Sequence, residues 1–297
     1  MLRVAGCALV ACGLAFPAEL PLLGLAHAGV QVSNMGQARA FYHDVLGLEE
    51  AFPGAAGASY FKVNDDQFIE VTPGLETQTV VPLSHLAMRT AQLAKLYQML
   101  RERGLKPSAI RKWEDGTSRF SLEPLPGQLG FLEFVQYDKG SGPVRTRRKA
   151  LGARRMGDHL QHAGFVTLDI AVARKFYVET LGFRETWSRT NAGKLVLVHL
   201  RMPGPSGDYI EIVNRAGAEV TRAIGGEAGH FSFEVPDAHA THEEGLRRAP
   251  QARRQDPRFG MDERWQCNLF DQDGTRVEFM QPRDKSKTTP VPPAVVP

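Results

Sequence analysis

A segment near the start of the chain recurs, with a similar sequence, in the second half of the chain. Residues 27–42 read HAGVQVSNMGQARAFY, and residues 162–177 read HAGFVTLDIAVARKFY. Without any gap, three dipeptides of the first copy reappear in the second: Ala38-Arg39 as Ala173-Arg174, Phe41-Tyr42 as Phe176-Tyr177, and Leu46-Gly47 as Leu181-Gly182. Self-similarity over a stretch of this length indicates that one structural unit is built twice. The sequence therefore predicts two domains of one kind.

Each copy begins with a strand and continues with a helix. The runs LAHAGVQVS and LQHAGFVTL alternate between apolar and polar residues, as half-buried strands do. The stretches 35–47 and 170–182 that follow have apolar residues at helical spacing and end at a glycine, which favours the position after a helix. Short strand-like runs come next, at 59–63 and 68–72 in the first copy and at 194–202 and 208–213 in the second.

A related unit then completes each half. In the first half a strand is expected at 83–90, a helix at 91–104 and a last strand within 130–137. In the second half the matching segments are 229–236, 238–249, 268–270 and 275–282. The chain thus predicts an α+β protein of four strand, helix, strand, strand, strand units, paired into domains at 20–140 and 156–283.

Three segments lie outside these domains. Residues 1–18, MLRVAGCALVACGLAFPA, resemble an export signal, and LVAC fits a lipobox that would attach a lipid at Cys12. Export to the periplasm or to a lipid anchor is therefore expected, with a cytoplasmic location as the alternative. Residues 141–155 form a basic linker, and the Pro-rich tail 284–297 is expected to be disordered.

Composition limits the partners. With 297 residues, 42% of them apolar, the chain can bury two cores, and a net charge of +3 does not indicate nucleic-acid binding. After the leader, the sequence has no uninterrupted apolar run of about 18 residues, the length that a membrane span needs. If the leader is removed, Cys267 alone remains, which excludes an internal disulfide. Four units in one chain predict a monomer, with a homodimer as the open alternative. The expected partner is a small-molecule substrate.

Each half contains histidines and glutamates in the same order. All four glutamates lie between apolar neighbours, in FIEVT, FLEFV, YIEIV and RVEFM, where an unpaired carboxylate is costly to bury. Imidazoles and carboxylates converging from separate strands suit a divalent metal such as Zn, Ni, Mn or Fe, at most one per domain. The predicted ligands are His27, Glu70, His85 and Glu133 in the first half, and His162, Glu211, His230 and Glu278 in the second.

The other histidines have no counterpart at matching positions, and the sequence assigns them to ordinary core or surface roles. They are His43, His159, His199, His239 and His242.

These segments resemble a known family. Residues 27–50 and 162–185 look like the opening strand and helix of the vicinal oxygen chelate superfamily, and FDQDGTRVEFMQP looks like its closing strand. The superfamily includes glyoxalase I, fosfomycin and bleomycin resistance proteins and extradiol dioxygenases. The resemblance covers 22–282 and implies paired βαβββ modules that form glyoxalase-like, cupped mixed sheets around a metal, with two such cups in this chain. The family's metal positions fall on the eight residues above.

The resemblance leaves three classes of function. In glyoxalase-like members, four ligands of the His, Glu, His, Glu kind hold the metal, which acts as a Lewis acid on two adjacent substrate oxygens in isomerase or lyase chemistry. Both halves keep this set, so we expect this class first. Glu133 or Glu278 is the predicted proton-shuttling base, with Glu70 or Glu211 as the alternate. A non-catalytic protein of the bleomycin-resistance kind is a further alternative.

The other enzymatic alternative is an extradiol dioxygenase. The resemblance would map its Fe(II) ligands to His162, His230 and Glu278. It also implies a second-sphere tyrosine, where this chain has Asn268, and an acid-base histidine, which is not found near Asn214. These departures, and a Glu211 that could fill a position needed by oxygen, disfavour ordinary catechol cleavage.

Several further residues are expected to line the cups without binding metal. Arg89 shares a strand face with His85, so it could hold an anionic substrate group or pair with Glu133 or another strand carboxylate. The predicted lining residues are Arg89 and Gln31 in the first half, and Arg264, Trp265 and Asn268 in the second.

Overall fold

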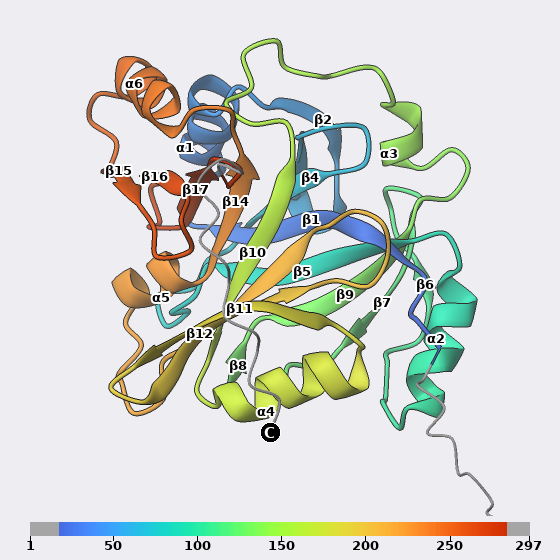
Figure 1. Cartoon of the computed structure of the whole chain (residues 1–297). Coiled ribbons are helices and arrows are strands. Elements are labelled where there is room, and N and C mark those ends of the chain that lie inside the picture. Colours follow the sequence, from blue (N-terminus) through green and yellow to red (C-terminus); the bar gives the residue numbers. More distant parts are fainter. Residues whose placement is uncertain (1–17, 284–297) are drawn as a thin grey trace, which may run out of the picture.

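The computed structural model describes residues 18–283, which form two curled mixed sheets (Figure 1). Cys7, Cys12, nearly all of the expected leader and the expected tail lie outside these residues. The first sheet has the strand order β2-β3-β4-β1-β5-β9-β7-β6. Its strands are β1 (Leu22–Val32), β2 (Glu49–Pro53), β3 (Ser59–Lys62), β4 (Phe68–Pro73), β5 (Leu83–Thr90), β6 (Arg111–Lys112), β7 (Ser118–Leu122) and β9 (Phe131–Gln136).

The second sheet repeats this order as β11-β12-β13-β10-β14-β17-β16-β15, with β8 added beside β10. In both sheets the first strand of the half lies at the centre, parallel to one neighbour and antiparallel to the other. The strands are β8 (Gln128–Leu129), β10 (Leu160–Thr167), β11 (Arg184–Asn191), β12 (Lys194–Arg201), β13 (Tyr209–Asn214), β14 (His230–Glu234), β15 (Arg254–Phe259), β16 (Trp265–Phe270) and β17 (Arg276–Met280).

The helices are short and lie around the sheets (Figure 1). The two expected helices at 35–47 and 170–182 form as one α-helical segment followed by a wider π-helical turn, and each begins at a side-chain cap, Asn34 or Asp169. The helices are α1 (Met35–Arg39), η1 (Ala40–Val45), η2 (Ala55–Gly57), α2 (Leu93–Glu102), α3 (Gly142–Arg145), α4 (Ile170–Lys175), η3 (Phe176–Thr180), α5 (Arg222–Ala228) and α6 (Ala238–Arg248).

The halves are joined by contacts that the repeated Phe-Tyr pair supplies. The hydroxyl of Tyr42 donates a hydrogen bond to Asp271 Oδ2 at 3.1 Å, and that of Tyr177 donates to Gln128 Oε1 at 3.0 Å. Both tyrosines are fully buried. Each half therefore sends its first helix to the other half, and β8 of the first half extends the second sheet by pairing with β10.

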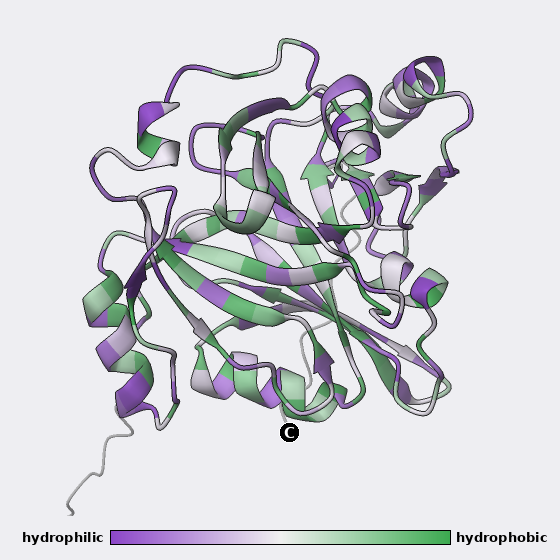
Figure 2. Cartoon of the chain, turned by 180° about the vertical axis from the view of Figure 1, so that it is seen from behind, coloured by the Kyte–Doolittle hydropathy of each residue, from purple (hydrophilic) through white to green (hydrophobic). Residues whose placement is uncertain are grey.

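The core runs continuously through both halves. Its apolar residues come from both sheets and from the inner sides of the helices. Figure 2 shows the central strands as mostly hydrophobic, with separate hydrophilic bands, and the peripheral helices with residues of both kinds. No helix among residues 18–283 is long and apolar enough to cross a membrane, and Cys267 is a buried free thiol. The expected α+β architecture of two halves with cupped mixed sheets is confirmed.

Candidate metal centres

In the second half, three predicted ligands meet at the centre of the sheet. His162 lies on β10, His230 on β14 and Glu278 on β17, which are successive neighbours in the sheet. His162 Nε2 is 3.1 Å from His230 Nε2 and 3.1 Å from Glu278 Oε2. All three side chains are buried, and one ligand atom from each lies within 4.8 Å of the others. This is a two-histidine, one-carboxylate set of the kind that holds non-haem Fe(II).

Glycine is required next to this set. Gly164 follows His162 by two residues on β10 and faces His230 across the strand pair. A Cβ atom at Gly164 would overlap the imidazole ring of His230, and one at Gly29 would overlap the ring of His85 in the first half. The repeated sequence HAG thus supplies a histidine and, on the same strand face, the space into which the second histidine fits.

The hydrogen bonds of this set leave lone pairs directed at its centre. His230 Nδ1 donates to the carbonyl of Ala228 at 3.0 Å, so the Nε2 atom of the neutral ring is the acceptor that faces the other ligands. Burial and the charge of Arg276 lower the pKa of His230 to about 4. Burial would raise the pKa of Glu278, but Arg276, His162 and His230 lower it below its usual range.

The residues fit a divalent cation. Glu278 Oε2 is buried and accepts no hydrogen bond from any described residue, although both histidines point at it. A neutral imidazole lone pair and an ionised, unsatisfied carboxylate oxygen converge on one point, which is the donor set that such an ion requires.

A cavity of about 380 Å³ borders Glu278 and Glu211, and a further hollow of about 390 Å³ adjoins it. Both are lined by Trp187 and His199. His199 Nε2 is 3.0 Å from Glu211 Oε2, and Glu211 Oε1 is 3.7 Å from His230 Nε2. Burial would raise the pKa of Glu211, but His230 and His199 lower it to about 2.

The core or surface role predicted for His199 did not include this contact with a predicted metal ligand. It is buried, and the register of β12 and β13 places it directly opposite Glu211. In the first half the residue opposite Glu70 is Tyr60, so His199 does have a counterpart, but of another residue type. Because the first half has a tyrosine at this position, comparing the histidines of the two halves does not identify His199. The signal available in the sequence was the strand alternation of KLVLVHLRM, without the register that pairs it.

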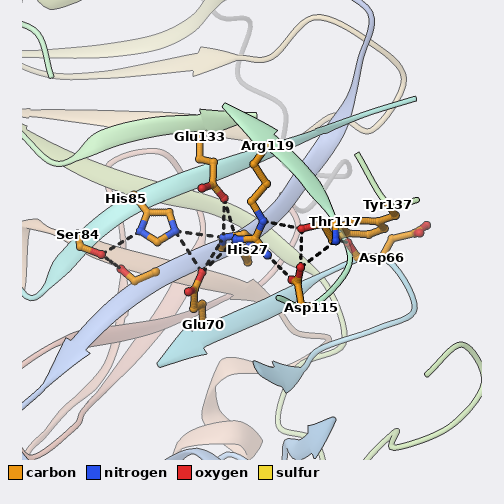
Figure 3. A network of polar contacts seen from close by, with 11 residues as sticks. His27, Asp66, Glu70, Ser84, His85, Asp115, Thr117, Arg119, Glu133 and Tyr137 are labelled. Carbon is orange, nitrogen blue, oxygen red and sulfur yellow. Dashed lines mark hydrogen bonds and ion pairs between the residues drawn. The ribbon is translucent and has the colours of Figure 1, made fainter. Parts of the chain in front are cut away.

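The first half repeats the ligand set, as Figure 3 shows. His27 Nε2 lies 3.1 Å from His85 Nε2, 3.0 Å from Glu70 Oε2 and 3.4 Å from Glu133 Oε1. Burial lowers the pKa of His27, but its hydrogen bonds with Glu133 and Glu70 outweigh burial and leave that pKa raised. Burial would raise the pKa of Glu70, yet His27 and His85 hold it well below the usual range.

An arginine that the sequence analysis did not single out enters this first set. Arg119, on β7, is 3% exposed, and its Nη1 atom lies 3.1 Å from Glu133 Oε1 and 3.7 Å from Glu70 Oε2. Its other terminal nitrogen contacts Asp115, and its Nε donates to Thr117 Oγ1 at 2.7 Å (Figure 3). Burial lowers the pKa of Arg119, but its electrostatic interactions with Tyr60 and with the neighbouring carboxylates outweigh burial and leave that pKa raised, so the guanidinium stays charged.

The predicted lining residues of the first half lie apart from the ligands. Arg89 pairs with Asp66 at 3.2 Å and lies over the ring of Tyr137. Of the two roles expected for it, a salt bridge is the one observed, although Asp66 is in a turn and not on a strand. Gln31 is half-buried at the end of β1, where it faces Thr72.

The predicted lining residues of the second half differ in their positions relative to the cavities. Arg264 lines the hollow of about 390 Å³ and donates to Gln161 Oε1 at 3.1 Å. Asn268 is fully buried opposite Glu278 on β16, and its Nδ2 donates to Gln255 Oε1 at 2.9 Å. Trp265 is 37% exposed and packs against His239 and Phe259, outside the lining of both cavities.

The other four histidines agree with the ordinary roles expected of them. His43 is partly exposed beside Asp44, and His239 is exposed against Trp265. His159 pairs with Asp208 at 2.8 Å, and His242 is a buried residue of α6.

Solved structures resemble this fold over nearly its whole length. The 2,3-dioxygenase LapB from Pseudomonas sp. KL28 superposes with a TM-score of 0.68 at 19% identity, covering 93% of this chain and 96% of that one. Homoprotocatechuate 2,3-dioxygenase from Brevibacterium fuscum, in complex with 3,4-dihydroxyphenylacetate, gives 0.66 at 23% identity, covering 91% and 83%. At these identities the likeness shows the fold alone.

No curated protein matches the sequence significantly. A family model described as the Glyoxalase/Bleomycin resistance protein/Dioxygenase superfamily matches residues 24–123 and 159–279, which are the two halves found in the structure. The chain belongs to this superfamily, the vicinal oxygen chelate family that the repeated sequence resembles.

Proposed function

We propose that the second half of the chain is an Fe(II)-dependent ring-cleaving dioxygenase site for a substrate with two adjacent hydroxyl groups. The observation that carries the proposal is that His162, His230 and Glu278 form a three-residue set beside an open cavity. Three protein ligands with free positions suit Fe(II) oxygenases, because the substrate and O₂ both need room at the metal. The fold similarity to extradiol dioxygenases supports this choice.

This proposal reverses the order of preference given by the sequence. That order rested on a missing acid-base histidine and on Glu211 as a fourth ligand. His199 supplies a histidine at the cavity, and its 3.0 Å contact engages Glu211 on the side away from the metal set. The tyrosine implied by the family is still replaced by Asn268, so the chain would do without that hydroxyl.

The roles of the chain's own residues follow from their positions. When bound, Fe(II) supplies Lewis acidity to a contacting hydroxyl and a redox centre for O₂. His199 would take a proton from a substrate hydroxyl in the cavity at Nδ1, because its Nε2 atom donates to Glu211, and would later return that proton to the ring-opened product. The ionised Glu211 holds that imidazole in place, and burial of His162 and His230 keeps bulk water away from the ligands.

The cavity favours a flat, anionic substrate. Trp187 lies 4.6 Å from His199 between ring centroids and offers a wall for an aromatic ring. Arg189, Arg215 and Arg258 also line this cavity, and none of the three pairs with a carboxylate of the described residues. A carboxylate on the substrate ring or its side chain would meet these guanidinium groups. 3,4-Dihydroxyphenylacetate has this chemistry.

One observation favours the glyoxalase-type alternative. Glu211 Oε1 lies 3.7 Å from His230 Nε2, so a modest side-chain movement would bring it to the metal as a fourth ligand. The site would then hold Ni²⁺ or Zn²⁺, and Glu278 or Glu211 would move a proton between adjacent substrate carbons.

Anaerobic reconstitution separates these reactions. The tag-free chain is loaded with Fe(II), Ni²⁺ or Zn²⁺ and given 3,4-dihydroxyphenylacetate or catechol with O₂, or a hemithioacetal without O₂. We expect O₂ uptake with Fe(II) only, and both atoms of ¹⁸O₂ in the ring-opened product, since the substrate supplies all four electrons. The His162→Ala, His230→Ala variant should be inactive, whereas the His27→Ala, His85→Ala variant should keep this activity. Hemithioacetal turnover with Ni²⁺ and no O₂ uptake would establish the alternative.

A further inference from the structure

Two residues occupy the same place in the two sheets. Arg119 on β7 faces Val135, two residues beyond Glu133 on β9. Gln266 on β16 faces Met280, two residues beyond Glu278 on β17. The register of the two last hairpins therefore makes Gln266 the structural counterpart of Arg119, although the two are not equally spaced from the glutamates along the chain.

The two cups also differ in which carboxylate oxygen an arginine uses. In the second cup, Arg276 approaches Glu278 Oε1 at 3.4 Å, and the histidines face the other oxygen, Oε2. In the first cup, Arg119 approaches Glu133 Oε1 at 3.1 Å, and this same oxygen faces His27 at 3.4 Å. Arg276 thus contacts the oxygen of its glutamate that the histidines do not face, and it leaves Oε2 without a hydrogen bond from any described residue.

Arg119 instead lies on the ligand side of its cup. Its Nη1 atom also approaches Glu70 Oε2 at 3.7 Å, and that oxygen faces both His27 and His85. Asp115 holds the far end of the guanidinium, while the rings of Tyr60 and Trp113 lie 5.6 and 5.2 Å from its central carbon. These contacts hold the charge beside the carboxylate oxygens that face the histidines (Figure 3).

We propose that Arg119 is a built-in cation that takes the place of the metal in the first cup. The guanidinium neutralises the buried carboxylates that a metal would otherwise neutralise, and it would repel a divalent ion brought to the same oxygens. The first cup thus has a complete ligand set, and Arg119 prevents a divalent ion from binding to it. The set consists of His27, His85, Glu133 and Glu70. The chain carries its metal in the second cup, where Gln266 is neutral and lines the cavity.

The inference predicts that one substitution opens a second metal site. In Arg119→Gln the first cup receives the residue found in the second, so the metal content should rise from about one to about two ions per chain. The matched control is Arg276→Gln, which also removes an arginine beside a cup glutamate but should add no ion. Metal is counted by elemental analysis of tag-free protein after anaerobic loading with Co²⁺, whose visible absorption reports new histidine coordination.

Measurements on the unsubstituted chain decide the case even if Arg119→Gln does not fold. We expect the His27→Ala, His85→Ala double variant to lose no Co²⁺ relative to the unsubstituted chain. A loss of one ion in that variant would overturn the inference, because the first cup would already hold metal beside Arg119. A folded Arg119→Gln protein that gains no ion, or gains one that the His27→Ala change does not remove, would overturn it as well. Both comparisons count ions in the first cup and do not depend on the proposed reaction.

Discussion

In the first cup, two imidazoles and two carboxylates close on one another and on Arg119. In the second, the two corresponding carboxylates, Glu211 and Glu278, border a cavity of about 380 Å³. The ligands, their strands and the glycine that admits the second histidine are the same in both. What differs is the residue opposite each ligand-bearing strand: Tyr60 or His199, and Arg119 or Gln266. The frame is thus built twice, and the two cups differ at the positions that face their ligands.

The largest difference in metal affinity is expected between variants of Glu278 and Glu133, the last glutamate ligand of each half. Glu278→Ala removes a ligand of the open set, and we expect metal affinity to fall more than about 10³-fold, beyond the cost of changing an outer-shell partner. Glu133→Ala should leave that metal in place and instead destabilise the fold by about 3 kcal/mol, since Arg119 loses a buried carboxylate. Metal titration and urea unfolding of both variants measure the two effects. Equal loss of metal would contradict the comparison.

The next contrast sets His199 against Tyr60. His199→Ala should lower kcat about 10² to 10³-fold while the metal content stays unchanged, because a proton-transfer group is lost and no ligand is removed. Tyr60→Phe, at the matching position of the first half, should leave turnover unaffected. Steady-state kinetics with elemental analysis test the pair. A loss of metal in His199→Ala would show instead that His199 only supports the ligand set through Glu211.

The glycines of the repeated HAG sequence give a smaller contrast. Gly164→Ala pushes the ring of His230 out of its position, so metal affinity should drop about 100-fold. Gly29→Ala displaces His85 in the cup that Arg119 fills, so the affinity of the second cup should be unchanged. Titration with Co²⁺ measures the metal affinity of both variants, and circular dichroism tests whether each is folded. An equal drop in both would mean that the cups are coupled.

Much of this comparison could be predicted from the sequence, and its decisive part could not. The recurrence of His, Glu, His and Glu predicted residues that the structure brings together as two possible ligand groups, because each residue lies on a strand that the repeat identifies by itself. His199 and Arg119 act through the residues that face them across a strand pair. That pairing depends on register, which hairpin length sets and which one strand does not encode. A repeat of identical residues also does not identify structural counterparts of different type, such as Tyr60 and His199 or Arg119 and Gln266.

The smallest predicted effect concerns the two tyrosine contacts that join the halves. Tyr177 donates to an uncharged amide, Gln128, whereas Tyr42 donates to the carboxyl of Asp271. Burial raises the pKa of Asp271 from 3.8 to about 6, although hydrogen bonds from Thr275 oppose this. Because the fold favours the protonated form, this contribution to stability is complete below about pH 4 and is lost as pH rises through about 6.

Asp271→Asn removes this ionisation while keeping an amide oxygen for the turn that ends in Thr275. The free energy of unfolding of the variant, relative to the unsubstituted chain, should therefore improve by about 2 kcal/mol between pH 4 and pH 7.5. Gln128→Ala, at the other contact, should change stability by the same amount at both pH values, since neither partner there titrates in this range. Urea unfolding at the two pH values measures both differences. A pH-independent effect of Asp271→Asn would mean that this carboxyl is ionised in the fold, and the two contacts between the halves would then be alike in their response to pH.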